Sequence, residues 1–221
     1  MPGQIFGLQS LQPWVWRSLP LGLLTAADVF ARAFCRPGEI GVFLESPPPV
    51  GPNFSEHLAR YSLCAGPPRP GRCWLPAIGE IFPFLTNLLA RGSATRATDP
   101  HAPTDIPFQG GWVGWLGYDA AWEIERLPQL NPDPLPFPVA FWYEPAEFAW
   151  IDRLTGQVWL AAGSAADCER LQARLEQPAP WTLDSGSNAV AASGQAARVA
   201  STQQDYEAMV RQAKAYIRAG E

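Results

Sequence analysis

The chain of 221 residues is long enough to bury a sizeable core, in one large domain or in two small ones. Its hydrophobic fraction of 47% and aromatic fraction of 12%, with ten tryptophans, exclude a disordered polypeptide. The formal net charge of -5 comes from 21 acidic and 16 basic residues that are spread without blocks, so the basic surface that nucleic acid or an anionic membrane would need is missing. We expect neither as a partner.

The cysteines and histidines show no spacing typical of a zinc site, because no CxxC pair occurs. Since unpaired cysteine is among the most frequently buried residue types, we expect these thiols to be buried and reduced. The cysteines are Cys35, Cys64, Cys73 and Cys168, and the histidines are His57 and His101.

The N-terminus has no basic start followed by an apolar run and a small-residue cleavage site. No uncharged apolar run reaches the roughly 18 residues of a membrane span. We therefore expect a soluble, cytoplasmic protein.

The first half of the chain mixes predicted strands and helices. Thr25 is positioned to cap a helix that Pro37 ends, and three prolines after Ser46 prevent the preceding strand from continuing. The sequence GPPRPG at residues 66–71 is typical of a turn. In chain order we expect a short strand around Trp14–Trp16, a helix over Thr25–Phe34, strands over Ile40–Glu45, Arg60–Ala65 and Arg72–Leu75, and a helix over Ile81–Ala90.

The second half contains aromatic-rich strands that are close enough in sequence to pair as antiparallel neighbours. The RLTG sequence at residues 153–156 predicts a hairpin, and Ser164 caps a following helix. The expected elements are a short helix over Ala120–Leu127, strands over Val139–Tyr143, Glu147–Asp152 and Gln157–Ala162, and a helix from Ser164 to about residue 175. Together these elements predict an α+β fold of mostly antiparallel sheets with flanking helices.

A stretch rich in glycine and aromatic residues, Pro107–Pro128, carries Gly110, Gly111, Gly114 and Gly117 among tryptophans. Glycine leaves no side chain to pack, so its clustering in a strand indicates a bulge, a bound ligand or the close approach of another backbone. We expect close packing rather than a ligand.

Residues 176–200 are rich in Ala, Ser, Gly, Pro and Gln, which predicts a flexible linker. Ser201 and Gln204 match a capping box at the start of a helix that ends near Gly220. Its apolar positions lie on one face and need a partner to cover them, so we expect this C-terminal helix to be isolated and exposed.

Several segments in order resemble component I of aminodeoxychorismate synthase and of anthranilate synthase, two chorismate-utilising enzymes. They are FLES at residues 43–46, ARYSLCAG at 59–66, PFQGGWVGWLGYDAAWEIERLP at 107–128, LPFPVAFWYEP, FAWID, and STQQDYEAMVRQAKAYIRAGE at 201–221. The resemblance implies an N-terminal domain like that of anthranilate synthase component I over residues 1–175, a linker over 176–200, and over 201–221 the first helix of a truncated chorismate-binding domain. We therefore expect an N-terminal piece, either a fragment or a truncated gene product, that is inactive alone.

The family reaction implied by this resemblance replaces the chorismate 4-hydroxyl with ammonia from a glutamine amidotransferase partner, and it needs Mg²⁺. The residues of the segment WVGWLGYDAAWEIE resemble the aminodeoxychorismate branch, which serves folate and 4-aminobenzoate biosynthesis, more than the anthranilate branch. The anthranilate branch, which feeds tryptophan biosynthesis, and a non-catalytic module that binds tryptophan or docks on the glutaminase are the alternatives. No catalytic residue, metal ligand or cofactor is assigned to this chain.

The resemblance also implies a tryptophan pocket formed by Ser46, Leu58, Ala59, Arg60 and Tyr61. Each has a plainer interpretation. Ser46 would cap the turn into Pro47, Tyr61 would belong to the core, and Arg60 would pair with Glu45.

Glu123 and Glu125 are the one close carboxylate pair inside a motif. In a strand they would share a face, and in a helix they would not. We favour a solvated face or a structural ion pair over metal binding or acid-base chemistry.

Overall fold

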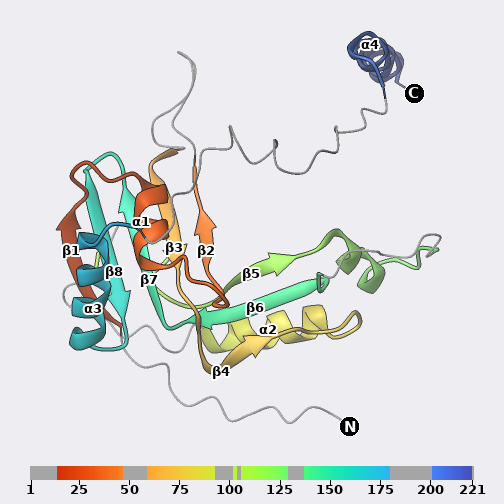
Figure 1. Ribbon diagram of the computed structural model, residues 1–221. Coiled ribbons are helices and arrows are strands. Elements are labelled where there is room, and N and C mark those ends of the chain that lie inside the picture. Colours follow the sequence, from red (N-terminus) through yellow and green to blue (C-terminus); the bar gives the residue numbers. More distant parts are fainter. Residues whose placement is uncertain are drawn as a thin grey trace. The chain divides into compact units, whose positions relative to one another are not determined.

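The computed structural model describes residues 14–46, 59–92, 102–103, 106–128, 137–179 and 201–220. The chain divides into two units, Met1–Leu183 and Asp184–Glu221. Their elements are labelled in Figure 1. In the described part of the chain, no helix is long and apolar enough to cross a membrane.

The first unit contains a five-stranded sheet in the order β1-β8-β7-β3-β2, and every neighbouring pair in it is antiparallel. Its members are β1 (Val15–Pro20), β2 (Val42–Leu44), β3 (Tyr61–Ala65), β7 (Glu147–Asp152) and β8 (Gln157–Ala162). Strands β7 and β8 form the predicted hairpin, with Asp152 opposite Gln157 at its closed end. Strand β2 is the outermost strand on its side and pairs with β3 alone.

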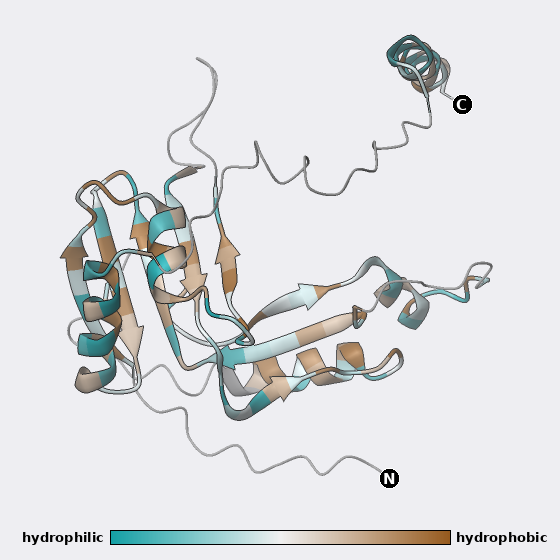
Figure 2. Cartoon of the chain, in the orientation of Figure 1, coloured by the Kyte–Doolittle hydropathy of each residue, from teal (hydrophilic) through white to brown (hydrophobic). Residues whose placement is uncertain are grey.

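Two helices, α1 (Ala26–Ala33) and α3 (Ala165–Glu176), pack on one face of this sheet (Figure 1). Thr25 and Asp28 form a capping box at the start of α1, and the Ser164 hydroxyl accepts a hydrogen bond from the Asp167 N–H at the start of α3. Figure 2 shows hydrophilic residues over the visible side of α3. Its buried residues, Cys168, Leu171 and Leu175, turn to the sheet, as the sequence pattern predicted.

A second, three-stranded sheet has the order β4-β6-β5. Its strands are β4 (Pro68–Trp74), β5 (Val113–Leu116) and β6 (Ala140–Pro145). Helix α2 (Ile81–Gly92) and the 3-10 helix η2 (Tyr118–Glu123) contribute Ile81 and Ala120 to a small core with Ala140 of β6.

One aromatic core joins the two sheets. It combines Leu63 of β3 and Phe148 and Trp150 of β7 with Phe141 and Tyr143 of β6. On β7, the alternate residues Ala149 and Ile151 instead join the core beneath α1 and α3. Because both of its faces are covered, β7 is buried along nearly its whole length and its sequence is continuously apolar from Phe148 to Ile151.

Gly114 and Gly117 of the glycine-rich stretch meet neighbouring backbone and Gly110 meets the Trp14 side chain, which confirms the expectation of close packing. A Cβ added to Gly114 would overlap the carbonyl oxygen of Phe141 on the paired strand β6, and one added to Gly117 would lie 2.9 Å from the carbonyl oxygen of Val139. Only a residue without a side chain allows β6 to approach β5 in this way.

Two predicted elements differ in detail from the structure. The helix expected over Ala120–Leu127 is the 3-10 helix η2, and it begins and ends earlier. The GPPRPG sequence is not a separate turn, because β4 already begins at Pro68. Strand β4 lies at the edge of its sheet, and its register with β6 shifts between Pro68 and Cys73. Its prolines, which have no N–H to donate, therefore remove no hydrogen bond from the interior of the sheet.

The described part of the second unit, residues 201–220, contains the helix α4 (Gln203–Ala219). Its capping box is formed by Thr202 and Asp205, so the prediction of Ser201 and Gln204 was wrong by one residue. Gly220 ends the helix with a φ of 79°, a left-handed conformation that favours glycine. Within its own unit, no residue of α4 is buried.

Candidate functional site

The candidate site lies where β2 ends and β3 begins. The β2–β3 register pairs Val42 with Ala65 and Leu44 with Leu63. The ladder ends at Leu44, but the Arg153 guanidinium contacts both the Ser46 carbonyl oxygen and the Ser62 hydroxyl, so the structure brings together the two chain segments that the sequence singled out. Leu58, the fifth predicted member, lies outside the described residues.

Arg60 pairs with Asp152, so the suggested pairing with Glu45 was wrong. Its Nε donates to Asp152 Oδ1 at 3.0 Å and its Nη2 donates to Oδ2 at 2.7 Å, which is a two-pronged guanidinium–carboxylate contact. The cause is the β3–β7 register, which sets Tyr61 opposite Asp152 and therefore brings Arg60 to the end of β7. The Arg60 guanidinium also lies over the Tyr61 ring, 4.6 Å from its centre.

Asp152 is 4% exposed and also organises the β7–β8 turn. Its Oδ1 accepts hydrogen bonds from the backbone N–H groups of Leu154 at 3.0 Å and Thr155 at 3.3 Å. Burial raises the pKa of Asp152, but the hydrogen bonds from Arg60 and Thr155 outweigh burial, so the pKa lies below its usual value. Asp152 is therefore ionised and fixed at neutral pH.

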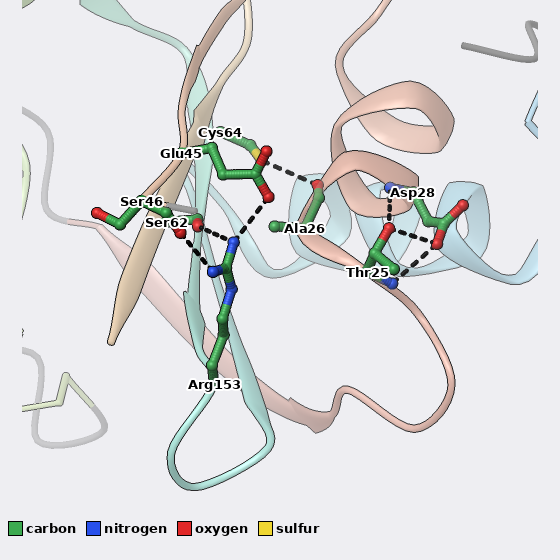
Figure 3. Close-up of polar contacts among 8 residues, drawn as sticks. All are labelled: Thr25, Ala26, Asp28, Glu45, Ser46, Ser62, Cys64 and Arg153. Carbon is green, nitrogen blue, oxygen red and sulfur yellow. Dashed lines mark hydrogen bonds and ion pairs between the residues drawn. The ribbon is translucent and has the colours of Figure 1, made fainter. Parts of the chain in front are cut away.

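Arg153, the next residue, is the contact point that sequence reasoning missed. Its guanidinium donates to the Ser46 carbonyl oxygen, to Glu45 Oε1 at 2.7 Å and to the Ser62 hydroxyl at 3.2 Å (Figure 3). Its backbone N–H donates to the Arg60 carbonyl oxygen at 3.0 Å. In the sequence Arg153 is only the first residue of the RLTG turn, and no local signal connects it with FLES 107 residues earlier.

The remaining predicted residues differ in their surroundings. Ala59 is buried, with 7% of its surface exposed. Tyr61 is half-buried and meets Trp150 edge-on, with ring centres 5.6 Å apart, at the border of the aromatic core. Ser46 is half-buried, and among the described residues it is the carbonyl of Ser46, not the hydroxyl, that holds Arg153.

Chemically, this end of the sheet presents two guanidinium groups, two carboxylates and a hydroxyl beside an aromatic wall. The charges balance, because Arg60 pairs with Asp152 and Arg153 with Glu45. Placed donors and acceptors next to an apolar surface are what an amino-acid zwitterion with a large side chain requires. In the structure the charged groups pair with one another, and ligand binding at this end of the sheet stays a prediction.

Of the two carboxylates Glu123 and Glu125, Glu123 has a structural role. Glu123 accepts hydrogen bonds from the backbone N–H groups of Gly79 at 2.6 Å, Ile81 at 2.7 Å and Phe82 at 3.0 Å, and so caps the start of α2 from a distant segment. Desolvation raises the pKa of Glu123, but these hydrogen bonds lower it on balance. Glu125 is exposed, and the two side chains do not form a joint site.

A second buried charge cluster was not anticipated. Glu144 of β6 is 1% exposed and lies between Arg69 Nε at 3.5 Å and Arg72 Nε at 3.7 Å. These distances are too long for good hydrogen bonds, and both carboxylate oxygens of Glu144 lack a hydrogen-bond partner among the described residues. Burial raises the pKa of Glu144, and the two arginines oppose this without cancelling it.

The thiols and carboxylates of the described residues form no metal centre. No three His, Cys, Asp or Glu side chains in that part of the chain gather as metal ligands. All four cysteines are free, and Cys64 and Cys168 are buried as predicted, whereas Cys35 and Cys73 are only partly buried.

Comparison with known proteins shows which protein family this chain resembles. The family described as chorismate binding enzyme matches residues 80–221. The chain is 44% identical over 215 residues to the anthranilate synthase component I-like protein of Synechocystis sp., covering 97% of this chain and 43% of that protein. It is 36% identical over 132 residues to anthranilate synthase component 1 of Cereibacter sphaeroides and 37% identical over 141 residues to that of Thermus thermophilus.

Those two matches cover 54% and 62% of this chain, and 26% and 29% of the respective relatives. The chain thus spans less than half the length of the curated relatives it matches.

Proposed function

This chain belongs to the family of chorismate-binding enzymes, and from that premise we propose that it forms the N-terminal portion of an aminodeoxychorismate synthase component I. The observation that carries the family is the similarity over 97% of the chain to an anthranilate synthase component I-like protein. The amino-acid sequence of residues 112–125, WVGWLGYDAAWEIE, supports the aminodeoxychorismate branch. The complete protein would convert chorismate and ammonia into 4-amino-4-deoxychorismate.

The second candidate is the N-terminal portion of an anthranilate synthase component I. It is favoured by the names of the relatives, which are anthranilate synthase components. Both candidates use chorismate and ammonia, and they differ in the product.

We propose residues 1–175 as the N-terminal domain and residues 201–221 as the first helix of the chorismate-binding domain. The division of the chain between Leu183 and Asp184 supports this arrangement. So does α4, whose Tyr206, Met209 and Ile217 are exposed and need a protein surface to cover them. We expect the Mg²⁺ ligands and the groups that activate chorismate in the remainder of that domain, and a glutamine amidotransferase as the ammonia-supplying partner.

The branch is tested by product analysis. The 221-residue chain, joined to the proposed chorismate-binding domain of its own full-length protein, is incubated with chorismate, ammonium and Mg²⁺, and the products are separated by chromatography. We expect 4-amino-4-deoxychorismate from the joined protein and no product from the 221-residue chain alone. Anthranilate as the product would support the second candidate. Product from the 221-residue chain alone would contradict the proposal that the catalytic groups lie outside this chain.

We further propose that the site at Ser46 and Tyr61, with Ala59, Arg60 and Leu58, binds tryptophan, either as a regulatory site or as the function of a stand-alone module. Its support is that Arg153 contacts both Ser46 and Ser62, the neighbour of Tyr61, beside the two arginine–carboxylate pairs. Titration calorimetry of the chain with L-tryptophan should show binding that Ser46→Ala weakens. The absence of any binding heat with the unmodified chain would remove this proposal.

A further inference from the structure

Arg153 connects three strand ends of the five-stranded sheet. It follows β7 directly, and its guanidinium reaches the Ser46 carbonyl and the Glu45 carboxylate beyond β2 as well as the Ser62 hydroxyl in β3 (Figure 3). Its backbone N–H binds the Arg60 carbonyl just before β3. A single residue from the hairpin turn therefore touches both segments of the candidate site.

The segment that Arg153 holds has little other support. Strand β2 contains three residues, lies at the edge of the sheet, and its ladder with β3 ends at Leu44. Glu45 and Ser46 therefore lie beyond the last ladder pair. Among the described residues, the Glu45 carboxylate and the Ser46 backbone carbonyl both accept hydrogen bonds from Arg153.

Arginine suits this position because its planar fork donates in several directions at once. The Arg153–Glu45 pair has side chains 24% and 38% exposed, so its direct contribution to stability is small. The contact to the Ser46 carbonyl is different, because it fixes the backbone at the residue whose hydroxyl the proposed site would use. The main effect of Arg153 is thus geometric.

We propose that Arg153 is a positioning residue that sets the orientation of Ser46 and so controls the affinity of the site for tryptophan. This inference rests on the proposed tryptophan binding, but the fixing of Ser46 stands on the contacts alone. Arg153 does not need to touch the ligand. It acts by holding Glu45 and Ser46 against β3.

The experiment compares Arg153→Met and Arg153→Lys with Arg174→Met in the 221-residue chain. Arg174 is a matched control, because its side chain is also 24% exposed and forms an ion pair with Glu147 in the same unit. Affinity for L-tryptophan is measured by calorimetry, and amide hydrogen exchange is measured on a peptide that covers residues 42–46. Thermal unfolding shows that each variant is folded at the measuring temperature.

We expect Arg153→Met to weaken tryptophan binding about tenfold or more and to speed exchange in residues 42–46, while Arg174→Met leaves both unchanged. Arg153→Lys should give an intermediate affinity, because an ammonium group retains the charge but not the fork. Equal affinity and equal exchange in Arg153→Met and the unmodified chain would overturn the proposal. If Arg153→Met binds tryptophan with unchanged affinity but shows faster amide exchange in residues 42–46, Arg153 does not control binding. Only its structural contact with Ser46 would then remain.

The two proposals fail separately. If the unmodified chain gives no binding heat with tryptophan while Arg153→Met still speeds exchange, the tryptophan site is wrong and the positioning of Ser46 is right. If the unmodified chain binds tryptophan and Arg153→Met binds it equally well, the tryptophan site stands and control by Arg153 is wrong.

Discussion

The guanidinium of Arg60 makes two parallel hydrogen bonds to the carboxylate of Asp152, and it thereby ties the residue before β3 to the last residue of β7. The same carboxylate accepts from the backbone N–H groups of the β7–β8 turn. One buried acid thus fixes a hairpin turn and a neighbouring strand.

Replacing this acid should lower the free energy of unfolding. We expect Asp152→Asn to cost about 1–3 kcal/mol, because it converts two charge-assisted hydrogen bonds into weaker ones while keeping an oxygen for the turn. Urea unfolding measures the change. Glu169→Gln is the control, because the Arg17–Glu169 pair is largely exposed at 3.4 Å and should cost less than about 0.5 kcal/mol. Similar small losses in both variants would contradict the role of Asp152.

The Asp152 contribution should depend on pH in a defined direction. Its pKa is lowered in the folded state, so the ionised form stabilises the fold above the unfolded pKa of roughly 3.9, and this stabilisation is lost as pH falls through the folded pKa. The difference in unfolding free energy between the unmodified chain and Asp152→Asn should therefore shrink as pH falls below about 4. A constant difference between about pH 3 and 6 would be inconsistent with the lowered pKa.

Glu144 should show the opposite slope. Burial raises its pKa, so its favourable contribution is complete below the unfolded value of roughly 4.3 and is lost as pH rises through the higher folded pKa. Relative to Glu144→Gln, the unmodified chain should lose unfolding free energy as pH rises above about 4. Urea unfolding of both chains across this range tests the direction, and a relative gain with rising pH would show that Arg69 and Arg72 outweigh burial.

The close approach of β5 and β6 predicts a severe effect of Gly114→Ala. The new Cβ would collide with the backbone at Phe141, which cannot move without disturbing β6, so we expect a loss of at least about 3 kcal/mol or failure to fold. Gly79→Ala is the comparison, because nothing lies within 4 Å of its added Cβ and only the strain of its φ of 96° remains, about 1 kcal/mol. Equal stability losses in circular-dichroism melts would contradict the steric argument.

Local sequence signals predicted most elements because their causes are local. Thr25 and Ser164 cap helices that begin at the next residue, and the short apolar, aromatic-rich runs of β7 and β8 follow directly from their burial. The partners of Arg60, Arg153 and Glu123 could not be predicted, because each contact depends on strand register or on segments more than 40 residues apart. For the same reason Ser46 and Tyr61 were paired only through a family resemblance.

The capping of α2 by Glu123 has a consequence for synthesis on the ribosome. The first turn of α2 contains no acidic residue of its own, and its cap lies 42 residues downstream of Ile81. While the chain is growing, the exposed N–H groups of this turn therefore have no carboxylate partner from Glu123 until that residue has been added and has left the exit tunnel. Helix α2 and the segment that ends in η2 consequently reach their final form together, late in the emergence of the first unit.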